Sequence, residues 1–239
     1  FHGRMLDARR LFAQTMAAAE AQKFPQITSG YYAWSAVTEA LIGNRAVALT
    51  QAREVVRTST APEPALRAAV ALALAGAPDE AAAAVAQRGQ ARPEDTFLRV
   101  AYVPAAAAAV ALARNRPAEA VEVLRPAAPD QFGFIAALAP TYFEGLAYAK
   151  AGAHTEAARV FRSVVDHRGT DPFSPFVPMA QLGLARALAA SGDLEASRRA
   201  YDVLLGWWAE ADGDFALARI ARQERAVMGA GREEDSSGR

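Results

Sequence analysis

Histidine and cysteine are the side chains that would most readily bind a metal or transfer a proton. The chain has no cysteine, which excludes disulfide and thiolate chemistry. The histidines, His2, His154 and His167, lie far apart, and none has a second His or Cys at the spacing of zinc ligands. We therefore expect no metal site, and we expect His154 to lie on the surface where a helix begins.

Motifs that carry catalysis are absent or incomplete in this sequence. Neither glycine-rich phosphate loop, GxGxxG or GxxxxGK[ST], occurs, so nucleotide binding has no support. No GxSxG motif is present, and His167-Arg168-Gly169 has glycine where the catalytic loop of a kinase requires aspartate. The sequence predicts no catalytic residue, no cofactor and no enzyme activity for this segment. An unrecognised enzyme with convergent titratable residues is the alternative to this prediction.

The charge balance and the hydropathy of the chain give no support for binding to nucleic acid or insertion into a membrane. Lys and Arg number 26 and Asp and Glu also number 26, so no net field favours nucleic acid or an anionic membrane. The longest apolar stretch, Val100 to Leu112, contains Pro104 and is too short to span a membrane. We expect neither nucleic-acid binding nor a membrane span in this segment, and its localisation stays open.

The elements that must position any binding residue are indicated by a phrase that occurs twice. Its residues are Gly145, Tyr148, Gly152, Ala157 and Phe161, and at the same offsets Ala185, Leu188, Gly192, Ser197 and Tyr201. The two turn glycines are 40 residues apart, a period typical of solenoids built from helical hairpins. In the same register, the earlier turn residues are Gly43, Gly76 and Asn115, each followed five residues later by Ala48, Ala81 or Ala120.

Close packing between two antiparallel helices explains these residue types. A small residue at Gly145 lets the second helix approach, Ala157 fits beneath it, and Phe161 fills the space toward the next hairpin. A glycine such as Gly152 supplies the left-handed turn that ends the first helix. The pattern therefore indicates packing and does not by itself indicate a ligand.

The phrase resembles the tetratricopeptide repeat at Gly145, Tyr148, Ala157 and Phe161, and Gly152 matches its usual turn glycine. Glu144 and Thr141 depart from that pattern, which has an apolar residue and a tryptophan at these two positions. The resemblance implies an all-α fold, a right-handed superhelical solenoid of about five antiparallel hairpins. The expected elements of this single solenoid, 1–228, are a leading helix at 4–22, hairpins near 28–58, 62–90, 95–126, 137–167 and 177–209, a capping helix at 214–228, and then a disordered tail at 229–239.

A longer stretch, from Ala61 to Val227, is similar to the C-terminal repeat region of bacterial eukaryotic-like serine/threonine protein kinases. Its most specific part is Asp166-His167-Arg168-Gly169 followed by Ser174-Pro175, within the proline-containing joint from His167 to Pro178. Related tails also follow winged-helix DNA-binding domains. The resemblance implies that this segment is the C-terminal region of a larger signalling protein, in which a kinase or DNA-binding domain precedes Phe1.

In tetratricopeptide arrays the inner surface is formed mainly by the first helix of each hairpin. Transferred to this chain, that rule gives as groove candidates Tyr102, Leu112, Tyr142, Leu146, Lys150, Met179, Leu182 and Arg186. Several of them could instead belong to the core between repeats. We expect a non-catalytic scaffold that binds a protein or peptide, with self-association through the uncapped N-terminal edge of the array as a further possibility. The alternative is a small-molecule sensor with a pocket lined by residues such as Tyr102 and Tyr142.

Overall fold

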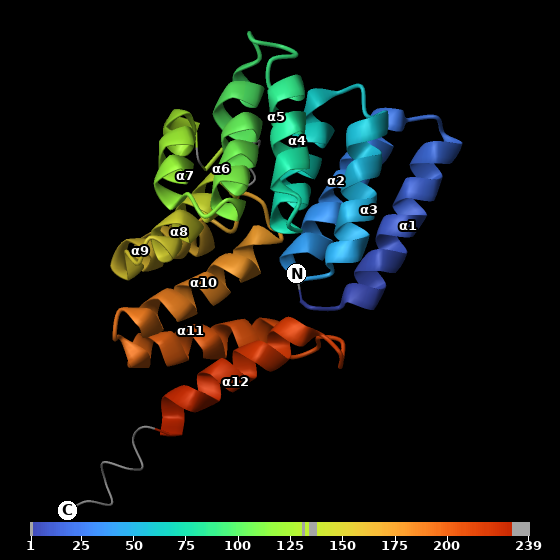
Figure 1. Cartoon of the computed structure of the whole chain (residues 1–239). Helices are drawn as coiled ribbons and strands as arrows, with labels where there is room; N and C mark the ends of the chain where they lie inside the picture. Colours follow the sequence, from blue (N-terminus) through green and yellow to red (C-terminus); the bar gives the residue numbers. More distant parts are fainter. Residues whose placement is uncertain (1, 131, 134–137, 231–239) are drawn as a thin grey trace, which may run out of the picture.

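The computed structural model describes residues 2–130, 132–133 and 138–230, and over these ranges the chain is helical, with no strand (Figure 1). The helices, in order, are α1 Met5–Ala21, α2 Pro25–Leu41, α3 Arg45–Thr58, α4 Pro62–Leu74, α5 Pro78–Arg88, α6 Val103–Ala113, α7 Pro117–Leu124, α8 Ala139–Lys150, α9 His154–Asp166, α10 Phe176–Ala190, α11 Leu194–Trp207 and α12 Ala216–Ala230. A π-helical turn, η1 Leu98–Tyr102, leads into α6, and a 3-10 turn, η2 Arg125–Asp130, follows α7. Residues 231–239 of the expected tail lie outside the described ranges.

Helices that are neighbours in sequence pack as pairs, and the first helices of successive pairs also contact one another. The pairs are α2 with α3, α4 with α5, α6 with α7, α8 with α9, and α10 with α11. Helices α4, α6 and α10 are buried along most of their length, because each lies between its own partner and the neighbouring pairs. Alanine-rich sequences suit these central positions, because a small side chain lets backbones approach closely.

A left-handed residue ends the first helix of every pair. The predicted turn residues Gly43, Gly76, Asn115, Gly152 and Gly192 all have positive φ, between 59° and 91°. At Gly152 the backbone N–H donates to the Ala149 carbonyl (3.2 Å), and the Ala153 N–H donates to the Tyr148 carbonyl (3.0 Å). Both bonds recur at the other four junctions, so the same Schellman turn closes each one.

The small residues expected at the start of each second helix are all fully buried. Ala48, Ala81, Ala120, Ala157 and Ser197 each have an exposed fraction of 0%. Phe161 of α9 lies between two glycines, Gly145 of α8 and Gly183 of α10, whose added Cβ atoms would each lie under 3 Å from its ring. One aromatic ring therefore joins a hairpin to the next one along the chain.

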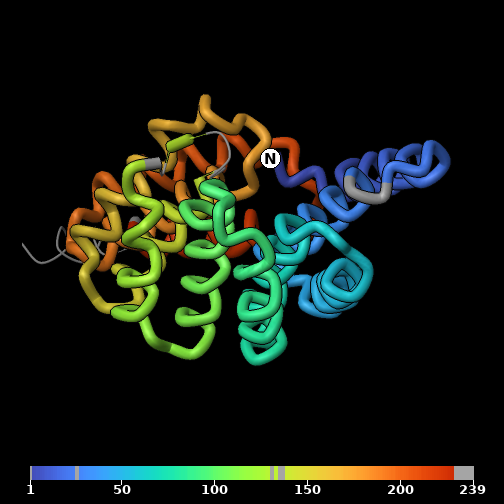
Figure 2. The backbone as a smooth tube through the Cα atoms, turned by 90° about the horizontal axis from the view of Figure 1, so that it is seen from above, coloured from blue at the N-terminus to red at the C-terminus, as the bar shows by residue number. Residues whose placement is uncertain are grey.

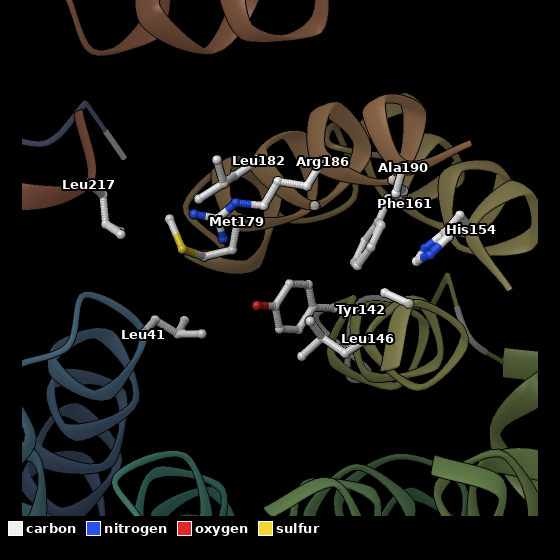
Figure 3. A pocket seen from close by; sticks show the side chains of 13 residues that line it. Leu41, Tyr142, Leu146, His154, Phe161, Met179, Leu182, Arg186, Ala190 and Leu217 are labelled. Atoms are coloured by element: carbon white, nitrogen blue, oxygen red, sulfur yellow. The ribbon is translucent and has the colours of Figure 1, made fainter. Parts of the chain in front are cut away.

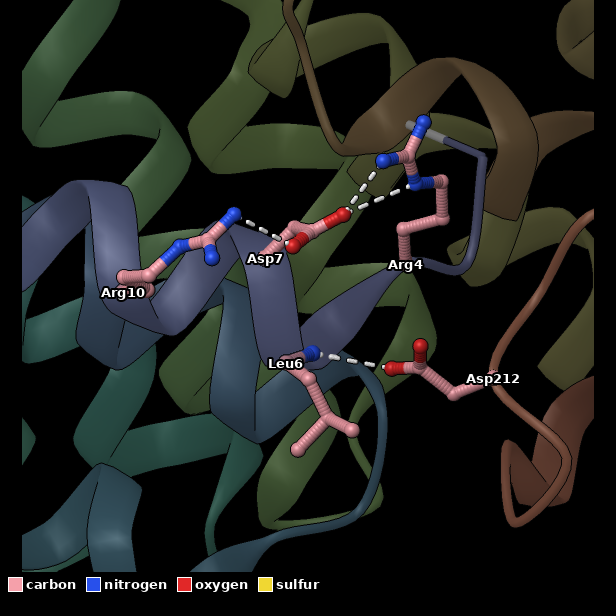
Figure 4. Close-up of polar contacts among 5 residues, drawn as sticks. All are labelled: Arg4, Leu6, Asp7, Arg10 and Asp212. Carbon is pink, nitrogen blue, oxygen red and sulfur yellow. Dashed lines mark hydrogen bonds and ion pairs between the residues drawn. The ribbon is translucent and has the colours of Figure 1, made fainter.

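The two ends of the chain meet, so the row of hairpins closes on itself (Figures 1 and 2). The N–H of Leu6 donates to the Asp212 carboxylate at 2.8 Å, and the Asp212 N–H donates to the Gly3 carbonyl at 3.1 Å. We call these three residues the clasp; Figure 4 shows the bond between Leu6 and Asp212. Inside the closed row, Trp34 of α2 contacts Phe176 of α10, with ring centroids 6.2 Å apart.

Candidate functional site

A pocket of about 320 Å³ lies between α8 and α10 and faces the interior of the closed row (Figure 3). Five of the eight predicted groove residues line it: Tyr142, Leu146, Met179, Leu182 and Arg186. The other lining residues are Leu41, Ala149, His154, Phe161, Gly183, Ala187, Ala190 and Leu217. We call this space the central pocket. It draws together side chains from both ends of the chain, because Leu41 belongs to α2 and Leu217 to α12.

Local packing explains why space is left at this point. Phe161 inserts between α8 and α10 against Gly145 and Gly183, which sets the distance between the two helices. Beside that contact the facing positions are the small residues Ala149 and Ala187, which do not fill the gap. The resulting walls are apolar, as is usual for sites that bind small molecules.

Tyr142 places the one hydroxyl group among the lining residues in this pocket. Its side chain is 6% exposed, and its ring packs against Phe176, Phe143 and Phe161 with centroids 5.1, 5.5 and 6.1 Å apart. Figure 3 shows the hydroxyl pointing into the open space. Burial raises the pKa of this phenol well above its ordinary value, so the group keeps its proton. Among the described residues, the fully buried side-chain atoms that lack a hydrogen-bond partner are Gln51 Oε1, Arg88 Nε and Trp208 Nε1. The Tyr142 hydroxyl is not one of them, because it faces the space of the pocket.

Arg186, another polar residue that lines the pocket, is held by a carboxylate. Its Nε and Nη2 donate to the two carboxylate oxygens of Glu224 at 3.0 and 2.9 Å, and the Tyr201 hydroxyl donates to the same carboxylate at 2.8 Å. Burial disfavours the charged form of Arg186, but the bonds and charge of Glu224 and Tyr201 outweigh it, so its pKa is raised. The guanidinium therefore stays charged, and its charge is balanced within the protein.

The remaining groove candidates, Tyr102, Leu112 and Lys150, lie away from the central pocket. Lys150 donates from Nζ to the Leu112 carbonyl at 3.0 Å, which satisfies a carbonyl at the end of α6. Leu112 is buried, and Tyr102 borders a different feature, the guanidinium of Arg67. His154, expected on the surface, is half-buried at the pocket's edge.

Arg67 is a polar residue that the sequence reasoning missed. Its Cζ lies 4.3 Å from the ring centroid of Trp34 and 5.4 Å from that of Tyr102, so two aromatic faces hold the cation. Burial lowers its pKa, and no carboxylate of the described residues forms an ion pair with it. The signal that could have revealed it is its position as a single charge in the apolar helix α4, PEPALRAAVALAL, beyond the first turn.

The described residues contain no group of three or more His, Cys, Asp or Glu placed to hold a metal ion. In the same part of the chain, no helix is both long and apolar enough to cross a membrane. Comparison with known protein families, with curated proteins and with solved structures finds no match for this chain.

Proposed function

We propose that this chain is a non-catalytic, tetratricopeptide-like recognition module whose central pocket binds a small molecule. The observation that carries the proposal is the Tyr142 hydroxyl, which belongs to a largely buried side chain and is directed into a mainly apolar space. A donor in this place is available to hydrogen-bond a bound molecule, while the apolar walls around it bury the rest of that molecule.

The solenoid part of this proposal is supported by repetition in the backbone. Five junctions share one Schellman turn, and the first helices of successive pairs contact one another. These are the features expected when one supersecondary unit recurs along a chain. In keeping with the resemblance around His167 to Pro178, we propose that the module serves as a C-terminal regulatory arm of a bacterial signalling protein such as a serine/threonine kinase.

Burial of the groove residues favours a small molecule over a peptide as the ligand of the inner surface. Leu112, Tyr142, Met179 and Leu182 are all less than one-tenth exposed, so a peptide could not contact them without opening the closed row. A molecule that fits within about 320 Å³ needs no such opening.

Blocking the pocket tests this function. Ala190 is an exposed residue at the pocket's edge, and Ala190→Trp should fill part of the space without disturbing the core. Ala46→Trp, at an exposed position of α3, is the matched control. We expect fragments detected by ligand-observed NMR to bind the unmodified chain and Ala46→Trp, and to lose binding in Ala190→Trp. A fragment library with no binders, or binders indifferent to Ala190→Trp, would contradict the proposal.

A second candidate function is a protein-interaction scaffold that associates with a second copy of the chain. The observation that favours it is helix α1, which projects from the rest in Figure 2 and, together with the residues that follow it, exposes Leu11, Phe24 and Ile27. A groove of about 550 Å³ lies beside them and is lined by Phe24, Tyr32 and Val55 together with polar residues. Because the net charge of the chain is zero, two copies would meet without long-range repulsion.

Sedimentation velocity across a range of concentrations tests this second function. We expect a dimer that Ile27→Glu disrupts and that Val203→Glu, at an exposed apolar position on the distant helix α11, leaves intact. A chain that stays monomeric at the highest concentrations would remove self-association from consideration.

A further inference from the structure

The polar groups around the central pocket restrict the chemistry of what it can hold. Tyr142 and Arg186 both present polar hydrogens there, while none of the thirteen lining residues is Asp or Glu. His154, the remaining polar lining residue, has a ring nitrogen that can accept, but in Figure 3 it lies on the other side of the pocket from the Tyr142 hydroxyl. The Tyr142 proton is therefore directed toward space that a ligand can occupy.

We infer that the ligand of the central pocket is an uncharged, mainly apolar molecule that carries one acceptor oxygen, as a small ketone or ester does. This inference rests on the proposed function and adds the class of ligand to it. The acceptor oxygen receives the hydrogen bond of the Tyr142 hydroxyl, and the apolar remainder packs on Leu146, Met179 and Leu182.

The charge balance of Arg186 argues against an ionic ligand. Its guanidinium already makes two hydrogen bonds to Glu224, and Tyr201 supports that carboxylate with a third. An anion that took both of these N–H groups would have to displace the Glu224 carboxylate from Arg186. A cationic ligand would meet the positive charge of Arg186 with no carboxylate among the lining residues.

The volume of the pocket sets the size of the molecule. A water molecule occupies about 30 Å³ of liquid, so about 320 Å³ corresponds to roughly ten non-hydrogen atoms. Acetophenone, an aromatic ketone of this size, is a suitable probe. Ethylbenzene has the same shape without the acceptor oxygen, and benzoate has a similar shape with a negative charge.

Titration of these three probes into the full chain and into Tyr142→Phe tests the inference. For the unmodified chain we expect acetophenone to bind about tenfold more tightly than ethylbenzene, because one hydrogen bond distinguishes them, and benzoate to bind more weakly than acetophenone. Tyr142→Phe should remove the tenfold preference and leave the affinity for ethylbenzene unchanged. Its melting temperature should not fall, because the hydroxyl that it removes points into the pocket and not into the packed core.

Three outcomes would overturn the inference, and they separate it from the function on which it rests. If the probes bind at the pocket but the preference for acetophenone persists in Tyr142→Phe, the hydroxyl does not select the ligand. If benzoate binds more tightly than acetophenone, the pocket prefers an anion. Either result rejects the ligand class while the pocket stays a binding site. If no probe binds and the fragment library also has no binders, the inference and the proposed function both fail.

Discussion

Phe161 is held between two glycines on different helices, and adding one methyl group to either glycine should destabilise the fold. A Cβ built on Gly145 would lie 2.6 Å from Cε1 of the ring, and one built on Gly183 would lie 2.7 Å from Cε2. Carbon atoms in contact prefer about 3.5–4.0 Å, so the ring would have to move by roughly 1 Å. Moving away from one glycine brings the ring closer to the other, so no shift along the line between the two glycines relieves both contacts.

The expected loss of stability follows from two opposing effects. Forcing an extra methyl group into a packed core costs about 1–3 kcal/mol. Replacing a helical glycine with alanine contributes about 0.5–1 kcal/mol in the opposite direction through helix propensity. For Gly145→Ala and Gly183→Ala separately, we expect a net loss of about 1–2 kcal/mol, which lowers the melting temperature by about 2–8 °C in a chain of this length. Urea denaturation followed by far-UV circular dichroism measures the change.

Gly30 provides the control, because it lies in helix α2 and a Cβ added there meets no atom within 4 Å. Gly30→Ala should raise stability by about 0.5–1 kcal/mol. Combining Gly183→Ala with Phe161→Leu should lose less than the sum of the two single losses, because the smaller side chain relieves the contact. If Gly145→Ala and Gly183→Ala stabilise the chain as Gly30→Ala does, the packing argument for these helices is wrong.

Three further predictions concern backbone strain and buried charge. Lys23 has φ of 59°, so Lys23→Gly should raise stability by about 0.5–1 kcal/mol, read from the urea midpoint. Arg9 donates twice to the buried Glu39 carboxylate, so Arg9→Met should cost about 2 kcal/mol by the same assay, and Glu39→Gln added to it should recover part of the loss. Burial raises the pKa of the Asp171 carboxyl above its ordinary value of 3.8, so the folded state binds this proton more tightly than the unfolded state does. The stability that this proton provides is present at low pH and is lost as the pH rises through the folded-state pKa. Asp171→Asn should therefore raise the melting temperature at neutral pH, and the gain should vanish at about pH 3, where Asp is protonated in both states.

The turns of this fold could be predicted from the sequence because the requirement that sets them is local. A helix that ends in a left-handed residue favours glycine or asparagine, and Gly43, Asn115 and Gly152 stand in a common register. Lys23 forms the same turn between α1 and α2, yet it gave no signal, because lysine is not a residue type that marks a left-handed position. The all-helical class is also confirmed. It could be predicted because alanine content and helix-ending residues determine local structure within each hairpin.

The central pocket could be predicted only in part. The rule that first helices form the inner surface found Tyr142 and Met179, which follow from the hairpin register alone. It could not find Leu41 or Leu217, because these residues reach the pocket only when the ends of the chain meet. Whether the ends meet depends on small angles between successive hairpins that add up along the row, and a single sequence carries no direct record of that sum.

Closure of the row and formation of the pocket depend on the same contacts. In an open row Trp34 would lose its contact with Phe176, while Phe176 would keep its contacts with Tyr142 and Phe143 of α8. The hydrogen bonds of the clasp contribute about 1 kcal/mol each. Hydrogen bonds depend on direction, whereas apolar contacts do not, so these bonds restrict how the two ends can be placed. Apolar contact and the bonds of the clasp therefore act together to close the row, and Asp212 of the clasp fixes the register at which the ends meet. Because that register sets where Leu41 and Leu217 stand opposite Tyr142, a change that loosens the clasp should also alter what the pocket binds.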